Sequence, residues 1–154
     1  MDSSVTRESA ELRAEKRPAG ILPDRARPHS LPVERAVLAA MLREPESCIN
    51  LVIEKFRDDK VFYTPAHREI FNCIIELHNA SSGTDLISVA QRLKERNKLE
   101  AVGGEIYLAE LIDTIATTVN LESWCQVLVK YATLRRMIDV CSSALVKCYD
   151  SDVD

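Results

Sequence analysis

The chain lacks the patterns that mark nucleotide-hydrolysing sites and metal sites. Only four glycines are present, and none of them begins the GxxxxGK[ST] loop that binds phosphates. Gly103-Gly104 is followed by the acidic Glu105, so this pair predicts a turn between helices rather than a phosphate cradle. There is no CxxC, no HxxxH and no clustered Cys/His spacing, so we expect neither a metal site nor a cofactor site in this chain.

Long apolar runs are absent as well. No stretch of eighteen consecutive apolar residues exists, and residues 1–18 have no apolar centre of the kind that signal peptides contain. We therefore expect a cytoplasmic protein with no membrane partner. The net charge of −4 argues against a general nucleic-acid binder, because such proteins are usually strongly basic.

The titratable residues form no recognisable catalytic group. His67 and His78 lie about 16 Å apart if they share one helix, too far to share a metal ion or a proton. We interpret His67 as a structural hydrogen-bonding residue. Asp58 and Asp59 are adjacent acids followed by a lysine, which is typical of a solvated loop. The sequence thus favours a binding module over an enzyme.

Helical periodicity dominates the chain. Apolar residues recur every three or four positions in five short segments between residues 30 and 115, and no segment alternates with a period of two. The predicted fold class is all-α: a compact bundle of about five short helices followed by one long helix. Helix starts are indicated by Ser30, by Thr64-Pro65 and by either Thr84 or Asp85, and Asn97 indicates a helix end.

Three regions follow from composition. Residues 1–28 hold three of the six prolines and a dense mixture of opposite charges, which predicts a disordered leader. Residues 29–116 supply the apolar side chains of one globular helical body. Residues 117–154 contain the long helix and the residues after it, and we expect this region to mediate oligomerisation and partner binding.

The long segment from Asn120 to Tyr149 contains no proline and no glycine. As a helix it is roughly 45 Å long, whereas a compact body of about 90 residues is only about 30 Å across. Each large apolar side chain left in water forfeits ~1.5–3 kcal/mol, so the excess length predicts a partner that covers it. The predicted interface residues are Leu121, Trp124, Leu128, Tyr131, Leu134 and Leu145.

The five cysteines all fall inside helical patterns. With no secretion signal we expect them to be reduced and packed as small apolar residues. Cys141 and Cys148 are separated by about 10.5 Å of helix, which exceeds disulfide reach within one chain.

Four stretches, taken together and in order, resemble the N-terminal domain of bacterial replicative DNA helicases of the DnaB type. Three of them carry the patterns FYxPxHRxIF, DLIx[VL]AxxL and VGGxxYLxEL at matching spacings. The stretches are PHSLPVERAVLAAML (Pro28–Leu42), VFYTPAHREIF (Val61–Phe71), DLISVAQRLKERNKLEAVGGEIYLAEL (Asp85–Leu111) and VKYATLRRMI (Val129–Ile138). The resemblance covers about residues 28–148. Trp124 stands where that family often has tyrosine.

The resemblance implies a non-catalytic assembly and primase-docking domain of a hexameric helicase that unwinds duplex DNA. ATP and Mg²⁺ would act in a helicase domain absent from this chain. The long helix would be the first arm of a helical hairpin, with the turn beginning in residues 150–154. Hairpins would pair between subunits in a trimer of dimers, with DNA passing through the ring. Primase would dock beside the hairpin on Arg135, Arg136, Ile138 and Cys141.

Two other classes of function are compatible with an all-α chain. One is a helical DNA-binding regulator with a helix-turn-helix among the short helices; the acidic balance and the lack of a basic recognition helix count against it. The other is a small all-α enzyme, for which the sequence shows no means of holding a cofactor or ion.

Overall fold

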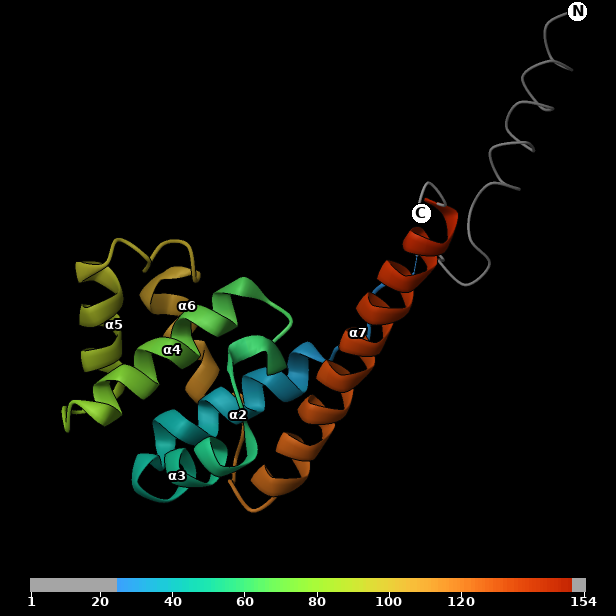
Figure 1. The fold of residues 1–154 in the computed structure, drawn as a ribbon. Helices are drawn as coiled ribbons and strands as arrows, with labels where there is room; N and C mark the ends of the chain where they lie inside the picture. Colours follow the sequence, from blue (N-terminus) through green and yellow to red (C-terminus); the bar gives the residue numbers. More distant parts are fainter. Residues whose placement is uncertain (1–24, 151–154) are drawn as a thin grey trace, which may run out of the picture. The chain divides into compact units, whose positions relative to one another are not determined.

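The computed structural model describes residues 25–150, and within that range every regular element is helical. The all-α prediction is therefore confirmed (Figure 1). Residues 1–24 of the predicted leader, and residues 151–154 of the predicted turn, lie outside the described residues. The helices are α2 (Leu31–Arg43), α3 (Pro45–Lys55), α4 (Pro65–Asn79), α5 (Leu86–Glu95), α6 (Gly104–Ile112) and α7 (Leu121–Tyr149), with a 3₁₀ turn at Asp59–Val61.

Prolines and caps explain where the helices begin. α2, α3 and α4 each have a proline in the first turn, where its missing N–H costs no hydrogen bond. The Asp85 carboxylate accepts hydrogen bonds from the Ser88 N–H (2.9 Å) and hydroxyl (3.0 Å), and these bonds lower the pKa of Asp85. Ser30 and Thr64 occupy N-cap positions, but their side chains make no capping hydrogen bond. Asn97 has φ 57°, as expected for a residue that ends a helix.

The core lies around α2, which packs against α3, α4 and α6. α2 is buried along most of its length, and its own apolar residues Val37, Leu38 and Met41 are fully buried in this core. Phe62 packs against Phe71 with ring centroids 5.1 Å apart, and it anchors the loop between α3 and α4. The body is thus a set of short helices held by one shared apolar centre.

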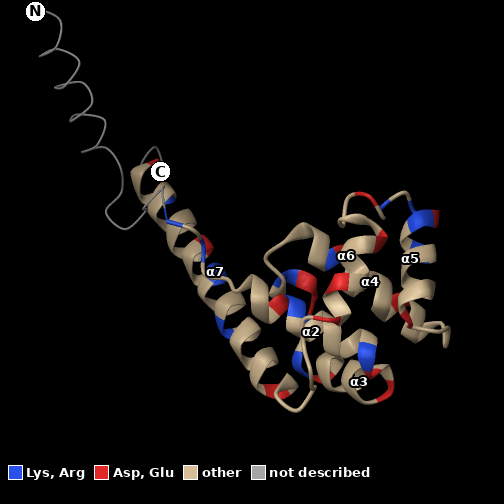
Figure 2. Ribbon diagram, turned by 180° about the vertical axis from the view of Figure 1, so that it is seen from behind, with Lys and Arg blue, Asp and Glu red and all other residues tan. Residues whose placement is uncertain are grey.

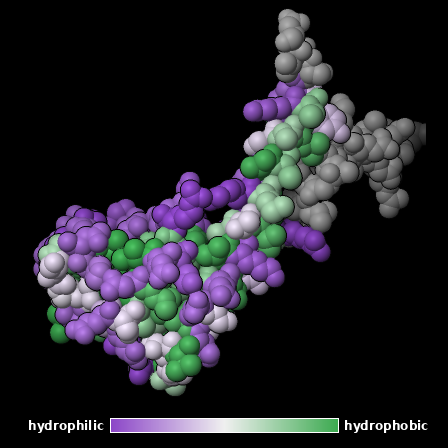
Figure 3. All heavy atoms as spheres, turned by 60° about the horizontal axis from the view of Figure 1, so that its bottom comes forward, coloured by the Kyte–Doolittle hydropathy of each residue, from purple (hydrophilic) through white to green (hydrophobic). Residues whose placement is uncertain are grey.

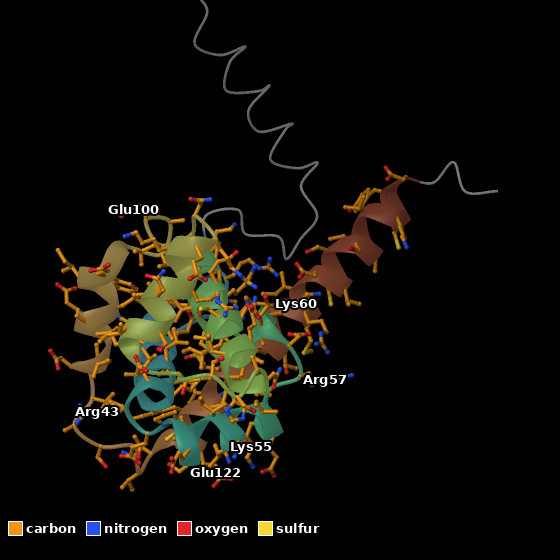
Figure 4. All side chains as sticks on the ribbon, turned by 90° about the vertical axis from the view of Figure 1, so that its left-hand side faces the viewer. Arg43, Lys55, Arg57, Lys60, Glu100 and Glu122 are labelled. Carbon is orange, nitrogen blue, oxygen red and sulfur yellow. The ribbon has the colours of Figure 1, made fainter. Side chains whose placement is uncertain are left out.

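Arginine side chains bind backbone carbonyl oxygens at two places on the body. Arg43 donates hydrogen bonds to the carbonyl oxygens of Ile112 (3.2 Å) and Ile115 (2.8 Å), just where α6 ends (Figure 4). The predicted fifth helix extended to Ile115, but the structure ends it at Ile112, and Asp113 is its C-cap. Arg68 binds the Phe62 carbonyl oxygen at 2.7 Å. Carbonyl groups that lack a helical partner are satisfied in this way.

The first half of α7 belongs to the body. Contacts group residues 28–135 into one unit, and among the described residues they place 25–27 and 136–150 in a second unit. Leu121, Cys125 and Leu128 are buried in the core, which is why the body extends past residue 116, where the sequence placed its end. Lys55 of α3 pairs with Glu122 of α7 at 3.0 Å (Figure 4).

Replacing Gly103 by alanine is expected to destabilise the body by about 1–3 kcal/mol. Gly103 has φ +112°, and an added Cβ would meet the Tyr107 Cβ at 2.8 Å. Gly104 also has a positive φ of +78°, but a Cβ added there would meet no atom within 4 Å. Gly104→Ala is therefore the matched control, and thermal unfolding should show the larger loss for Gly103→Ala. Equal losses would mean that the contact with Tyr107 contributes nothing.

Candidate assembly surface

Within residues 28–135, one face of α7 is used to build the body. Leu121, Cys125 and Leu128 are spaced by four and three residues and are each at most 3% exposed. Two of them, Leu121 and Leu128, were predicted to lie at a subunit interface. Their side chains are already covered by their own chain, so they are not available to a subunit interface.

Arg135 ends the part of α7 that packs on the body. Its guanidinium donates hydrogen bonds to the carbonyl oxygens of Pro28 (2.7 Å), Lys60 (2.8 Å) and Val61 (3.2 Å). It also lies over the Tyr63 ring at 5.7 Å, and His29 stacks on the same ring at 4.1 Å. The sequence placed Arg135 on a primase-docking surface, but the side chain is only 7% exposed. The structure instead makes it an internal anchor.

The second unit presents apolar side chains to solvent. Between residues 136 and 149 the large apolar residues Met137, Ile138, Val140, Val146 and Tyr149 are each 43–67% exposed. Figure 3 shows hydrophobic residues along this stretch of α7, and Figure 2 shows few charged residues on the helix. This amount of uncovered apolar surface on a helix indicates a binding surface.

A regular register of side chains, which includes Ile138, runs along α7. Its members are spaced alternately by three and four residues, which is the a/d spacing of a coiled coil, and none of them is buried in the chain. We call them the heptad stripe: Trp124, Val127, Tyr131, Leu134, Ile138, Cys141, Leu145 and Cys148. The four remaining predicted interface residues (Trp124, Tyr131, Leu134 and Leu145) all belong to it. The sequence interpretation had merged this stripe with the buried face.

The predicted docking residues do not share one face. At about 100° per residue, Arg136 lies about 160° around α7 from Ile138, on the opposite side of the helix. Ile138 and Cys141 lie in the heptad stripe, and Arg135 is buried. Arg136 is exposed and is the one residue of that set that is free to meet a partner away from the stripe.

The five thiols divide into two groups. Cys48, Cys73 and Cys125 are buried and packed in the core, as predicted, whereas Cys141 and Cys148 are exposed. Burial raises the pKa of Cys73 to about 11 and that of Cys125 to about 12, so both stay protonated at neutral pH. The prediction that all five pack as small apolar residues is therefore wrong for the two cysteines of the heptad stripe.

A buried polar network joins three helices of the body. The Glu34 carboxylate bonds His67 Nδ1 at 2.6 Å and accepts the Tyr63 backbone N–H at 2.5 Å. His67 Nε2 lies 2.6 Å from the Tyr107 hydroxyl, and burial raises the pKa of Tyr107. Glu34 is 0% exposed and His67 is 3% exposed. His67 is thus the structural hydrogen-bonding residue that the sequence predicted.

The sequence interpretation missed the partners of His67. Glu34 lies one turn before Val37 and Leu38, so an acid stands on the apolar face of α2. That pattern is a signal for a buried, paired carboxylate, because an unpaired charge in the core is strongly unfavourable. The Glu34–His67 pair at the centre of the network is closed off from solvent, which suits it to stability rather than to catalysis.

The described part of the chain offers neither a metal cluster nor a membrane span. Among residues 25–150, no group of three or more His, Cys, Asp or Glu side chains is placed to hold a metal ion. No helix in that range is long and apolar enough to cross a membrane.

Comparisons with known proteins agree with the geometry. The family model described as "DnaB-like helicase N terminal domain" matches residues 26–130. The replicative DNA helicase DnaB of Rhodothermus marinus is 33% identical over 148 residues, which cover 96% of this chain and 15% of that protein. The replicative DNA helicase DnaC of Bacillus subtilis is 32% identical over 118 residues, covering 77% of this chain and 26% of that protein. The chain therefore spans about a quarter or less of the length of these relatives.

The fold has a solved counterpart. The crystal structure of the N-terminal domain of DnaB helicase from Mycobacterium tuberculosis matches with a TM-score of 0.77 and 31% sequence identity. The match covers 80% of this chain and 85% of that chain.

Proposed function

The chain belongs to the family of DnaB-like helicase N-terminal domains, and we propose that it is the non-catalytic assembly and primase-docking domain of a replicative DNA helicase. The full-length protein would assemble as a hexamer, a trimer of dimers, around DNA in the cytoplasm. ATP and Mg²⁺ would act in the part of the protein that this chain does not span. The observation that carries the proposal is the heptad stripe, none of whose residues is fully buried in the chain.

A second copy of the chain is the partner that the stripe fits best. Heptad spacing is what allows one helix to pack along another with side chains interlocked. In coiled coils, charges beside the a/d positions select the partner, and like charges there separate identical helices. Beside Ile138, Cys141, Leu145 and Cys148 these flanking positions hold only Met137, Ser142, Ala144 and Tyr149. Nothing there opposes the pairing of identical chains.

Replacing Leu145 by asparagine is expected to weaken self-association by at least about tenfold. Burying one leucine contributes ~1.5–3 kcal/mol, and a factor of ten corresponds to about 1.4 kcal/mol. Sedimentation equilibrium of residues 1–154 would measure the change. Val146→Asn is the control, because Val146 is 49% exposed but lies about 100° around the helix from Leu145. The proposal fails if the unmodified chain stays monomeric at high concentration, or if both variants associate equally.

Primase docking is proposed for the side of α7 that carries Arg136, away from the stripe. Replacing Arg136 by glutamate in the full-length protein should reduce the ratio of primase-stimulated to basal ATPase activity. A reversed charge at an interface costs up to several kcal/mol, so we expect at least about a tenfold loss of primase affinity. Arg57→Glu, the same change at an exposed position outside α7, is the control. Unchanged stimulation with Arg136→Glu would remove this contact.

A further inference from the structure

The body carries an apolar depression of its own, formed by α5 and the start of α6. Its volume is about 180 Å³. A cavity of about 150 Å³ holds a benzene molecule, so this depression has room for one branched aliphatic side chain. We call its lining the α5–α6 patch: Leu86, Ile87, Ala90, Gln91, Lys94 and Glu105. All of these residues belong to the unit formed by residues 28–135.

The patch contains a projecting side chain beside the depression. Ile87 is 80% exposed although it stands in the first turn of an otherwise amphipathic helix. Ile87, Gln91 and Lys94 are spaced by four and three residues and so lie on one side of α5. An exposed isoleucine and a hollow that fits an isoleucine therefore occur on the same small surface.

The patch carries one basic and one acidic side chain, Lys94 and Glu105. Lys94 and Glu105 are exposed, and neither has an ion-pair partner within the described residues. The neighbouring charges of α5 are paired differently: Arg92 binds Glu76 at 2.5 Å, and Arg96 also binds Glu76. Lys94 and Glu105, which have no such ion pair, both line the depression.

We propose that the α5–α6 patch binds the same patch of a second copy about a twofold axis. Twofold contacts require a surface that is complementary to itself. Here Ile87 of each copy enters the depression of the other, and Lys94 of each copy faces Glu105 of the other. This contact is separate from the heptad stripe, because the two surfaces share no residue.

The contact is small. Stable interfaces bury about 800 Å² per partner, whereas this one centres on a single isoleucine per copy and a pair of surface charges. It therefore acts when copies are already held close together, because tethering raises the effective concentration of the second contact. The stripe on α7 supplies that proximity under the function proposed above.

Charge exchange provides the test. Lys94→Glu places two acids on each patch, and Glu105→Lys places two bases, so neither variant should pair with itself. A mixture of the two variants restores opposite charges across the contact. The assay is zero-length carbodiimide cross-linking of ¹⁵N-labelled with unlabelled residues 1–154, in which mass spectrometry counts only cross-links between copies at positions 94 and 105. We expect this signal in the unmodified chain and in the mixture, and at least about a tenfold loss in Ile87→Glu.

Three outcomes separate the possibilities. Val119→Glu, at a position that is 84% exposed and outside the patch, should leave the cross-link unchanged. The patch contact would be overturned if cross-links formed only within single copies, or if Ile87→Glu left the cross-link between copies unchanged as Val119→Glu does. Either result would stand even if sedimentation still showed self-association through α7. A cross-link between copies that persists at high concentration in Leu145→Asn would support the patch independently of the stripe.

Discussion

Replacing Glu34 by leucine is expected to lower the free energy of unfolding by about 3–5 kcal/mol. The carboxylate is 0% exposed and bonds both His67 Nδ1 and the Tyr63 N–H. Its loss leaves the buried His67 Nδ1 and the partly buried Tyr63 N–H without their hydrogen-bond partner. Guanidinium chloride denaturation, followed by circular dichroism, would measure the change.

The control for Glu34 is Glu46→Leu. Glu46 also stands in the first turn of its helix but is exposed, so it has the same helix-end electrostatics without the burial. We expect a change of within about 0.5 kcal/mol for that variant. The double variant Glu34→Leu, His67→Leu should recover part of the lost free energy of unfolding. Replacing both partners of a buried pair removes the groups that would otherwise be left without hydrogen bonds. Glu34→Leu with the stability of Glu46→Leu would contradict the role of the network.

Replacing Arg135 by methionine should cost about 3 kcal/mol, or roughly 10 °C in Tm for a domain of this size. The guanidinium satisfies three backbone carbonyl oxygens, on the segment before α2 and on the 3₁₀ turn. Methionine keeps much of the side-chain volume but donates no hydrogen bond. Lysine should recover only part of the loss, because one ammonium group does not reproduce the planar fork of donors.

Arg136→Met is the adjacent control for Arg135. Arg136 is exposed, and we expect its replacement to change Tm by no more than about 2 °C. Differential scanning calorimetry of both variants distinguishes an internal anchor from a docking residue. Equal Tm values for the two variants would return Arg135 to the surface role that the sequence favoured.

The fold class and the starts and ends of several helices could be predicted from the sequence, because they depend on residues that are close together in the chain. Prolines in first turns, the Asp85 cap and the left-handed Asn97 act through the backbone of their own neighbourhood, so they can be recognised without a structure. The apolar periodicity of each short helix likewise follows from one buried face. These features fixed the class of fold and the approximate positions of the helices.

The long helix shows where such reasoning stops. Its apolar residues satisfy a spacing of three or four along two offset faces, one containing Leu121 and Leu128 and the other Leu134 and Leu145. Periodicity alone does not separate them, because the choice depends on which residues the rest of the body covers. The same holds for Arg135, since three carbonyl oxygens from distant segments decide its position. Those contacts exist only after folding.

α7 contributes residues both to the core and to the heptad stripe. An unfolded chain has no helical stripe, so a second copy can bind only the folded form. The free energy of pairing therefore adds to the stability of the folded form by mass action. Under the function proposed above, a copy without a partner would be the least stable form of the protein in the cell. Since proteases act on opened chains, surplus copies would be removed first, and the supply of subunits would be matched to the assemblies that use them.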